Sequence, residues 1–307
     1  MNLQGCGTAL VTPFRADGSL DERALYDLAR WQVESGIDWL LACGTTGETP
    51  TLDEAEWLEV IRIVAEAARG QVPVWAGCSH NSTKQAVARA LTAAQIPGVT
   101  AILTANPWYN KPTQEGQFQH FKAVADAVKL PVVLYNIPGR SAANLEPATV
   151  KRLAEACENI AAVKESSGSL VQITDLLTQA PREFRVYSGD DMMTLGVLGA
   201  GGVGLISVVS NLIPAEMAEM VKAALANEWS TARRINRKYF PLMQGIFRET
   251  SPGPVKAILA MMGRIGEHYR LPMVPVSPAT RAMLERLAGE VGLLVHAPQP
   301  VGDPRMF

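Results

Sequence analysis

The sequence predicts a (β/α)8 TIM barrel, an α/β fold, with a helical C-terminal extension. Short apolar or β-branched runs alternate with longer, alanine-rich amphipathic segments from near the N-terminus to about residue 228. This alternation is typical of βα units around a parallel sheet. Eight such pairs follow one another, which favours a closed barrel over an open doubly wound sheet. We therefore predict a catalytic barrel over residues 1–228, a helical extension over 229–294 and a mobile, proline-rich tail over 295–307.

The predicted strands are short and buried, and the segments between them have helical periodicity. The strands are expected at Thr8–Pro13, Trp39–Cys43, Val74–Cys78, Thr100–Ala105, Val132–Asn136, Ala161–Lys164, Arg185–Ser188 and Val203–Val208. The helices are expected near residues 21–35, 53–69, 82–95, 114–128, 147–157, 169–179, 191–199 and 215–227, and in the extension near 229–249, 254–266 and 278–291. Asp53, followed by Glu56 at capping-box spacing, marks one helix start.

The composition argues against several classes of function. The 28 basic and 30 acidic residues leave a net charge of −2, without long runs of one sign. This balance does not favour binding to nucleic acid or to an anionic membrane. No apolar stretch reaches membrane-spanning length, and the N-terminus lacks the basic and apolar regions of a signal peptide. We therefore expect a soluble cytoplasmic protein.

The cysteines and histidines predict neither a disulfide framework nor a metal site. Cys6, Cys43, Cys78 and Cys157 are widely spaced, so buried thiols in a reducing compartment are favoured. The four histidines show no metal-ligand spacing such as H-E-x-x-H. No G-x-G-x-x-G follows the first strand, so a dinucleotide site is not expected either.

A lysine at the end of the sixth predicted strand is the leading catalytic candidate. The run Ile160-Ala-Ala-Val-Lys-Glu-Ser-Ser-Gly168 is apolar up to Lys164. Desolvation disfavours an ammonium group, so a buried lysine is a candidate amine nucleophile for a carbonyl substrate. The alternative is that Lys164 reaches solvent and pairs with Glu165.

Other polar residues also follow strands, and active sites of barrels form at the C-terminal ends of strands. Tyr135, on the adjacent strand, is placed for proton transfer to and from a carbinolamine. The turn of Thr45 and Thr46 leads into a helix and can hold a carboxylate. Arg140 offers a bidentate fork for a second carboxylate. Taken singly, these residues could be a core tyrosine, a helix cap and a surface charge.

These motifs resemble the dihydrodipicolinate synthase branch of the pyruvate-dependent class I aldolase superfamily, whose other well-known branch is N-acetylneuraminate lyase. The resemblance spans most of the chain. It is carried by Gly7-Thr-Ala-Leu-Val-Thr-Pro-Phe14, Gly44-Thr-Thr-Gly-Glu48, Tyr109-Asn-Lys-Pro-Thr-Gln-Glu-Gly116, Tyr135-Asn-Ile-Pro-Gly-Arg140, Val163-Lys-Glu165, Ser188-Gly-Asp-Asp191, Pro254-Val-Lys256 and Leu271-Pro-Met-Val-Pro275.

The resemblance implies that the enzyme condenses pyruvate with aspartate 4-semialdehyde to 4-hydroxytetrahydrodipicolinate, in lysine and diaminopimelate biosynthesis. Lys164 would form the Schiff base with pyruvate. Tyr135, Thr45 and Tyr109 would form a proton relay, with Tyr109 reaching in from a neighbouring subunit. The resemblance also implies a homotetramer built as a dimer of dimers. It implies no metal or organic cofactor, because the covalent imine on Lys164 is itself the electron sink.

The resemblance assigns substrate binding to four further positions. Thr46 would hold the pyruvate carboxylate, and Gly189 and Ile206 would line the pocket. Arg140 would bind the carboxylate of the semialdehyde.

This sequence departs from the family at the positions that bind the feedback inhibitor lysine. Inhibited members use a glutamate, histidines and a tyrosine there. The matching positions hold Gln85, Glu54 with Trp57, and Trp108, whereas Asn81 is retained. Loss of the carboxylate at position 85 removes a partner for the lysine ammonium, so weak or absent lysine inhibition is expected.

Two rival hypotheses remain open from the sequence. One is another pyruvate-dependent aldolase on the same scaffold, such as an N-acetylneuraminate or 2-keto-3-deoxy sugar acid lyase. At position 140 such a lyase would need a residue suited to hydroxyl groups rather than Arg140. The other is a barrel that binds a keto acid without turning it over.

Overall fold

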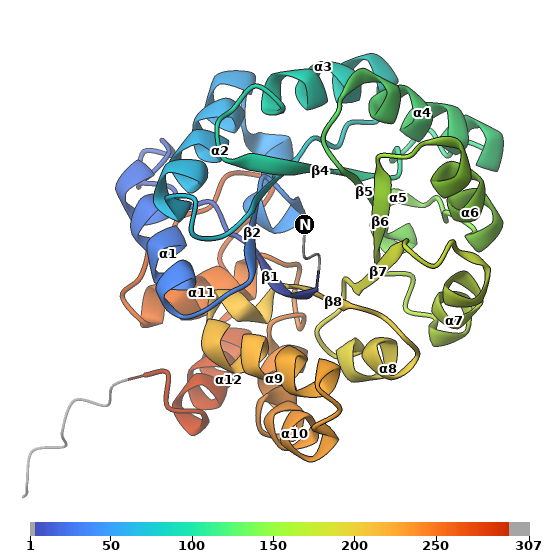
Figure 1. Ribbon diagram of the computed structural model, residues 1–307. Helices are drawn as coiled ribbons and strands as arrows, with labels where there is room; N and C mark the ends of the chain where they lie inside the picture. The colour runs from blue at the N-terminus through green and yellow to red at the C-terminus, as the bar shows by residue number, and fades with distance from the viewer. Residues whose placement is uncertain (1–3, 295–307) are drawn as a thin grey trace, which may run out of the picture.

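Eight buried runs form a closed parallel barrel in the computed structural model, which describes residues 4–294 (Figure 1). Each strand pairs with the next in sequence, and β8 closes the barrel against β1. The strands are β1 (Gly5–Ala9), β2 (Trp39–Ala42), β3 (Val74–Gly77), β4 (Val99–Ala105), β5 (Val132–Asn136), β6 (Ile160–Glu165), β7 (Arg185–Ser188) and β8 (Gly204–Ser207). The predicted (β/α)8 barrel is confirmed.

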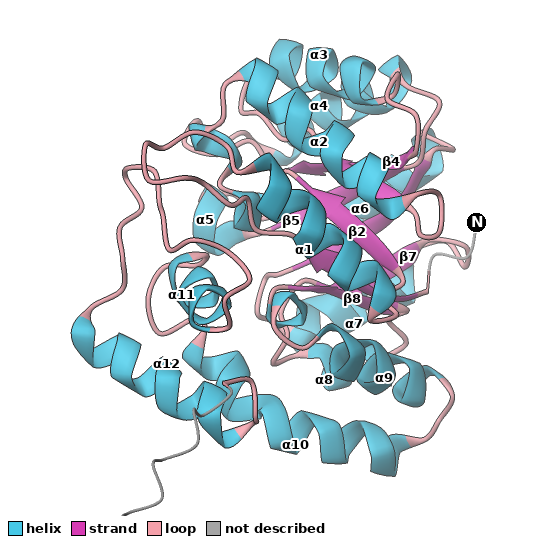
Figure 2. Ribbon diagram, turned by 90° about the vertical axis from the view of Figure 1, so that its left-hand side faces the viewer, coloured by secondary structure: helices cyan, strands magenta, loops and turns pink. Residues whose placement is uncertain are grey.

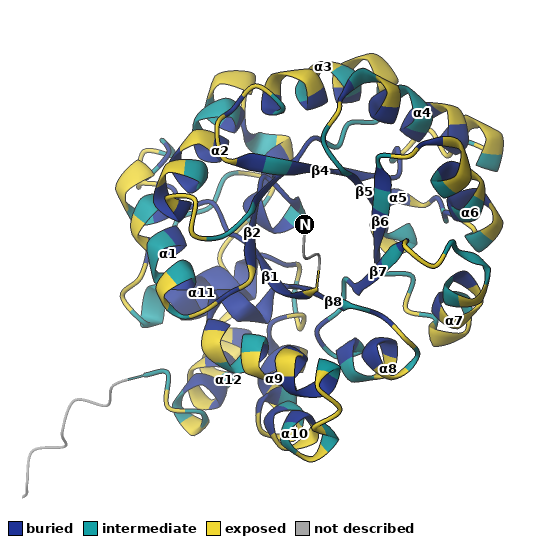
Figure 3. Ribbon diagram, in the orientation of Figure 1, coloured by how far each residue is buried: buried dark blue, intermediate teal, exposed yellow. Residues whose placement is uncertain are grey.

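Helices surround the barrel and bury one face each against it (Figure 3). They are α1 (Glu22–Glu34), α2 (Glu54–Ala68), α3 (Thr83–Ala93), α4 (Gln114–Ala127), α6 (Pro147–Ala156), α7 (Leu170–Gln179), α8 (Thr194–Gly199) and α9 (Pro214–Leu225). The capping box that starts α2 is present, because the Asp53 carboxylate accepts from the Glu56 amide at 2.8 Å and the Glu56 carboxylate accepts from the Asp53 amide at 3.2 Å.

Three helices make up the C-terminal extension: α10 (Trp229–Gly245), α11 (Gly253–Met261) and α12 (Pro278–Glu290). Helix α11 lies at the same end of the barrel as the short helix α5 (Pro138–Ser141), away from the N-terminus (Figure 2). The predicted C-terminal helices are therefore confirmed. The predicted tail, 295–307, lies outside the described residues. Within residues 4–294, no helix combines the length and apolar character needed to cross a membrane.

Aromatic side chains fill part of the barrel interior. Trp39 and Trp75 stack with ring centroids 4.8 Å apart, and Tyr187 meets them edge-on at 5.4 and 5.6 Å. Gly7 makes room for this packing, because a Cβ there would lie 1.9 Å from Nε1 of Trp39. With the interior filled at this level, open space for a small molecule is left at the C-terminal ends of the strands, where barrel active sites form.

The predicted position of the first strand was wrong. It was expected at Thr8–Pro13 but spans Gly5–Ala9. Glycine weakens an isolated strand, yet glycines are required here because Gly5 and Gly204 are directly opposite each other in the β1–β8 ladder. A Cβ on Gly204 would lie 2.2 Å from the carbonyl oxygen of Gly5. The need for small residues comes from the partner strand and is not visible in the local pattern.

The cysteines agree with the prediction. Cys6, Cys43, Cys78 and Cys157 are buried and carry free thiols. Burial is the main cause that raises the pKa of each thiol, as expected for small core residues rather than reactive ones.

Candidate active site

Lys164 stands at the C-terminal end of β6 and points into the mouth of the barrel. It is opposite Tyr135 of β5 and Tyr187 of β7 in the strand ladders. The side chain is enclosed, with a residue exposure of 4%. Its Nζ lies 4.3 Å from the centre of the Tyr135 ring. In the part of the chain that the structure describes, no carboxylate oxygen lies within 4.0 Å of this nitrogen.

The alternative pairing with Glu165 is not observed, because successive side chains of a strand point to opposite faces. The Glu165 carboxylate accepts from Asn136 Nδ2 at 3.1 and 3.2 Å and from the Ser167 amide at 2.6 Å. Burial raises the pKa of Glu165, and these hydrogen bonds oppose that effect. Lys164 is therefore an enclosed amine without an ion-pair partner among the described residues, as a nucleophile requires.

A cavity of about 280 Å³ opens in front of this lysine. It brings together most of the predicted site residues with several that the sequence did not single out. The lining residues are Thr45, Thr46, Tyr135, Ile137, Arg140, Lys164, Ser166, Gly189, Asp190, Met192, Val208, Phe247 and Ser251. Convergence of a phenol, two hydroxyls, an amine and a guanidinium on one cavity is the pattern expected of an active site.

The turn of the two threonines was expected to lead into a helix, and the threonines themselves lie in a 3-10 turn, η1 (Thr45–Gly47). The turn is closed by hydrogen bonds from the Gly47 amide to Gly44 O at 3.0 Å and from the Glu48 amide to Thr45 O at 3.2 Å. Thr46 is buried and Thr45 half-buried. Short 3-10 segments of this kind are common as connectors between longer elements.

Arg140 reaches the cavity from the other side. It lies on the short helix α5, and its Nη2 donates to the carbonyl oxygen of Ser251 at 3.3 Å. The residue is exposed, so its remaining donors are available to a ligand at the rim.

Gly189 and Ile206 differ in how they relate to the cavity. Gly189 follows β7 and lines the cavity, and its amide donates to Glu165 O at 2.9 Å. A Cβ there would lie 2.0 Å from Ser166 Oγ and 2.9 Å from Cγ and Cε of Lys164. Ile206 is buried in the barrel interior with Tyr135 and Tyr187, whereas Val208, two residues later, lines the cavity.

Tyr109 does not line the cavity of its own chain. It is 88% exposed and has a left-handed backbone, with φ 74°. Its loop is tied down on both sides, because Asn81 Nδ2 donates to Trp108 O at 3.3 Å and Asn110 Nδ2 donates to Asn81 O at 3.1 Å. A large aromatic group is thus presented to solvent on a fixed loop.

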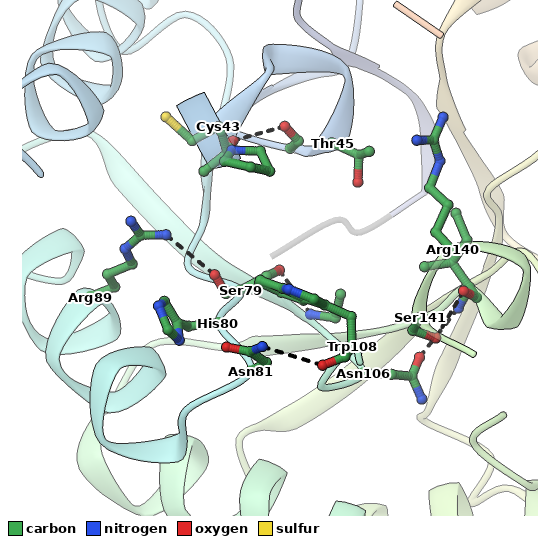
Figure 4. A pocket seen from close by; sticks show the side chains of 15 residues that line it. Cys43, Thr45, Ser79, His80, Asn81, Arg89, Asn106, Trp108, Arg140 and Ser141 are labelled. Atoms are coloured by element: carbon green, nitrogen blue, oxygen red, sulfur yellow. Dashed lines mark hydrogen bonds between the residues drawn. The ribbon is translucent and has the colours of Figure 1, made fainter. Parts of the chain in front are cut away.

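A second cavity of about 490 Å³ adjoins the first and shares Thr45, Ile137 and Arg140 with it (Figure 4). Arg89 and Arg140 lie on opposite sides of it. Arg89 is already paired, since its guanidinium binds the Glu54 carboxylate at 2.5 to 3.3 Å. Gln85 and Glu54, two of the positions that depart from the inhibited members, are not among the residues that line this cavity.

Asp191 supports the floor of the site without touching the cavity. Its carboxylate accepts from Ser207 Oγ at 2.5 Å and from the amides of Val208 and Val209 at 3.1 Å. Complete burial raises the pKa of Asp191 to about 6, against the opposing effect of these hydrogen bonds. Asp191 thereby fixes the end of β8, from which Val208 reaches the cavity.

Several functional candidates were missed by sequence reasoning. Ser166 is two residues beyond Lys164 on the same face, which strand periodicity could have indicated. Its buried hydroxyl makes no hydrogen bond to another described residue. Phe247 and Ser251 come from the loop after α10, and no local signal links them to the barrel mouth.

Among residues 4–294, no three His, Cys, Asp or Glu side chains are grouped so that they could hold a metal ion.

Comparison with known proteins decides the family. The model of the Dihydrodipicolinate synthetase family matches residues 2–290. The chain belongs to this family. It is 70% identical over 300 residues to the 4-hydroxy-tetrahydrodipicolinate synthase of Acidobacterium capsulatum, covering 98% of this chain and 99% of that one. It is 60% identical over 297 residues to the enzyme of the same name from Koribacter versatilis, covering 97% and 99%.

A solved structure agrees with this assignment. The dihydrodipicolinate synthase from Aquifex aeolicus superposes with a TM-score of 0.93 at 38% identity, covering 96% of this chain and all of that one. Membership of the dihydrodipicolinate synthetase family confirms the prediction of a lyase of the class I aldolase type. The comparisons do not favour a sugar-acid lyase or a barrel without turnover.

Proposed function

We propose that this chain is a 4-hydroxy-tetrahydrodipicolinate synthase in which Lys164 carries the keto acid. It condenses pyruvate with aspartate 4-semialdehyde to 4-hydroxytetrahydrodipicolinate, a step towards lysine and diaminopimelate. The observation that carries the proposal is the enclosed Nζ of Lys164, 4.3 Å from the Tyr135 ring centre in a cavity that both residues line.

The first half of the reaction is capture of pyruvate. The amine attacks the ketone carbon, and loss of one water molecule from the carbinolamine gives a protonated imine. Tyr135 and Thr45 line the same cavity as the amine, which supports their role in carrying protons to and from the carbinolamine oxygen. Thr46 holds the pyruvate carboxylate. No separate cofactor is required, because the protonated imine withdraws electrons from the adjacent methyl group.

The second half forms the carbon–carbon bond. The methyl group loses a proton, and the resulting enamine attacks the aldehyde carbon. Arg140 binds the carboxylate of the semialdehyde through its exposed guanidinium. The amino group of the condensed intermediate then displaces Lys164 from the imine carbon. This step closes the ring and frees the lysine.

Gly189 keeps room beside the amine, and Ile206 shapes the pocket from the barrel interior. The steric limit at Gly189 supports its role, because any side chain there would meet Lys164.

Tyr109 completes the relay from a neighbouring subunit. Its exposed ring on a fixed loop, close to a cavity that continues into the active site, supports this role. The assembly is a homotetramer arranged as a dimer of dimers.

Two experiments test the proposal. Borohydride reduction in the presence of pyruvate should add one pyruvate-derived mass to Lys164, and incubation with both substrates should release 4-hydroxytetrahydrodipicolinate. Absence of the adduct would refute the imine mechanism. A sugar-acid lyase would instead cleave N-acetylneuraminate or a related acid.

The shared tyrosine can be tested by mixing two inactive proteins. Tyr109→Phe and Lys164→Ala subunits, coexpressed with different tags and purified through both, should regain activity. The intact Lys164 site would then receive Tyr109 from its partner. No recovery in verified mixed oligomers would contradict the shared site, and mass photometry of the wild type tests the tetramer.

A further inference from the structure

A buried ion pair joins the C-terminal extension to the turn that carries the two threonines. Nζ of Lys256, on α11, lies 2.5 Å from Oε1 of Glu48. Glu48 directly follows the turn Thr45–Gly47, and 208 residues separate the two partners in sequence. Lys256 is 0% exposed. The predicted active site makes no use of either residue.

The environment of the pair explains why its position is fixed. Lys256 Nζ also donates to Thr12 O at 3.1 Å, and it lies 4.5 Å from the ring centre of Phe14 and 5.1 Å from that of Tyr269. Burial lowers the pKa of Lys256, while the carboxylate of Glu48 acts in the opposite direction. The Glu48 carboxylate, the Thr12 carbonyl and two aromatic faces surround the ammonium of Lys256, so it has one favourable location.

Stability alone is a weak reason for such a pair. Removing two charges from water costs several kcal/mol per ion, and replacement of buried pairs by apolar residues is often neutral or stabilising. Oε2 of Glu48 also makes no hydrogen bond to the described residues although it is buried. In some proteins a buried pair instead fixes the geometry of the segments that it connects.

The segment held here is the threonine turn. Glu48 has a left-handed backbone, with φ 52°, and its amide closes the turn onto Thr45 O. Thr12, whose carbonyl binds Lys256, donates through Oγ1 to Gly47 O at 2.7 Å. The turn is therefore fixed from two sides, by the carboxylate that follows it and by the hydroxyl beneath it.

We propose that Glu48 and Lys256 are positioning residues through which α11 fixes the Thr45–Thr46 turn for capture of the keto acid. The proposal rests on the proposed function of Lys164 and Thr46. It makes a helix outside the barrel responsible for the first half of the reaction. The second half depends on Arg140, on α5, and should be affected much less.

The test is the double variant Glu48→Gln with Lys256→Met, which keeps the volumes and removes both charges. The expected result is a pyruvate KM raised at least about tenfold and a matching loss of borohydride-trapped adduct, because misplacement by about 1 Å can cost about 100-fold. The KM for the semialdehyde, at saturating pyruvate, should stay within about twofold. Thr12→Val, which replaces the hydroxyl by a methyl group and so removes the bond to Gly47 O, should also raise the pyruvate KM, but by a smaller factor.

The matched control is another ion pair that ties the extension to the barrel. Arg270 binds the carboxylate of Glu56 at 2.5 and 2.6 Å, and Glu56 belongs to the capping box of α2 rather than to the threonine turn. Glu56→Gln with Arg270→Met should lower the Tm and leave the pyruvate KM unchanged. Adduct is measured per folded molecule in every variant, so that unfolding is not counted as lost capture.

The possible outcomes separate the two proposals. If wild-type protein forms no adduct with pyruvate, the proposed function fails. If wild-type protein forms the adduct and the Glu48–Lys256 variant forms it with the same pyruvate dependence, the positioning role is overturned. Equal increases in both KM values, or the same increase in the control pair, would also overturn it, since they would indicate general loosening. If the double variant does not fold, the single variant Glu48→Gln, which removes only the charge of the carboxylate, decides by the same criterion.

Discussion

Adding one methyl group at Gly189 should disable the amine without unfolding the barrel. The Cβ of Gly189→Ala would lie 2.0 Å from Ser166 Oγ and 2.9 Å from Cγ and Cε of Lys164. The Ser166 hydroxyl can rotate away at little cost. The lysine carbons must retreat by roughly half an ångström or more, because ordinary carbon–carbon contacts are about 3.5–4.0 Å.

The size of the effect follows from this displacement. Misplacement by about 1 Å can lower an enzymatic rate by about 100-fold, so half that distance should lower kcat/KM for pyruvate by about 10- to 100-fold. This corresponds to about 1.4–2.7 kcal/mol of transition-state stabilisation. Overpacking of this kind typically destabilises a protein by about 1–3 kcal/mol. The assays are steady-state kinetics, the yield of trapped adduct and the Tm.

Gly196→Ala is the matched control. Gly196 lies in α8, where a Cβ would make an ordinary 3.5 Å contact with Leu170. Alanine is a better helix former than glycine by about 0.5–1 kcal/mol, so this variant should keep full activity and lose no stability. If Gly189→Ala kept wild-type kcat/KM and adduct yield, close packing against Gly189 would not be what holds Lys164 in its reactive position.

Four further predictions follow. Lys164→Ala should lower turnover by at least about 10³-fold in folded protein and abolish the pyruvate adduct; near-normal rates would exclude the imine mechanism. Arg140→Ala should raise the KM for the semialdehyde about tenfold or more, with little change for pyruvate; equal increases would remove its assigned role. Submillimolar lysine should leave the rate nearly unchanged, because Arg89 already binds the Glu54 carboxylate; clear inhibition would show that another group binds the ammonium. Burial raises the pKa of Asp191 from 3.8 to about 6, so the folded state binds this proton more tightly than the unfolded chain and loses stability as pH rises through that interval, by at most about 3 kcal/mol. The Tm of Asp191→Asn minus that of the wild type should therefore increase from pH 4 to pH 7. If the two Tm values changed in parallel with pH, the raised pKa of Asp191 would be contradicted.

The fold could be predicted from local sequence patterns, because the buried residues of each strand and helix follow a pattern within that segment alone. Strand β6 was expected at Ala161–Lys164 and spans Ile160–Glu165. It could be predicted because a parallel strand buried on both faces is a continuous apolar run, which can be recognised without knowing the neighbouring strands. The same locality placed Tyr135 beside Lys164. Two adjacent strands that each end in a functional residue must bring those residues to the same end of the barrel. Prediction of the amine and the phenol therefore needed only the order of the elements.

Residues whose role depends on distant partners could not be predicted in this way. Glu48 and Lys256 were recognised only as parts of family motifs, because nothing near either residue in sequence indicates a partner 208 positions away. Asp191 is a comparable case. It too was recognised only as part of a family motif, and its three hydrogen bonds come from residues 207–209 at the end of β8.

The boundary near residue 228 separates the barrel from the C-terminal extension in the order of elements, but residues from both sides of it form the active-site cavity. The sequence pattern ends there because the eight βα units are complete, yet Phe247 and Ser251 line the cavity in front of Lys164. Ser251 also accepts the hydrogen bond from Arg140. Removing the extension would open the cavity to water, free the Arg140 side chain and leave the buried carboxylate of Glu48 without its cation. A barrel cut at this boundary would keep the nucleophile but lose the surroundings that make an amine reactive and hold two acidic substrates beside it.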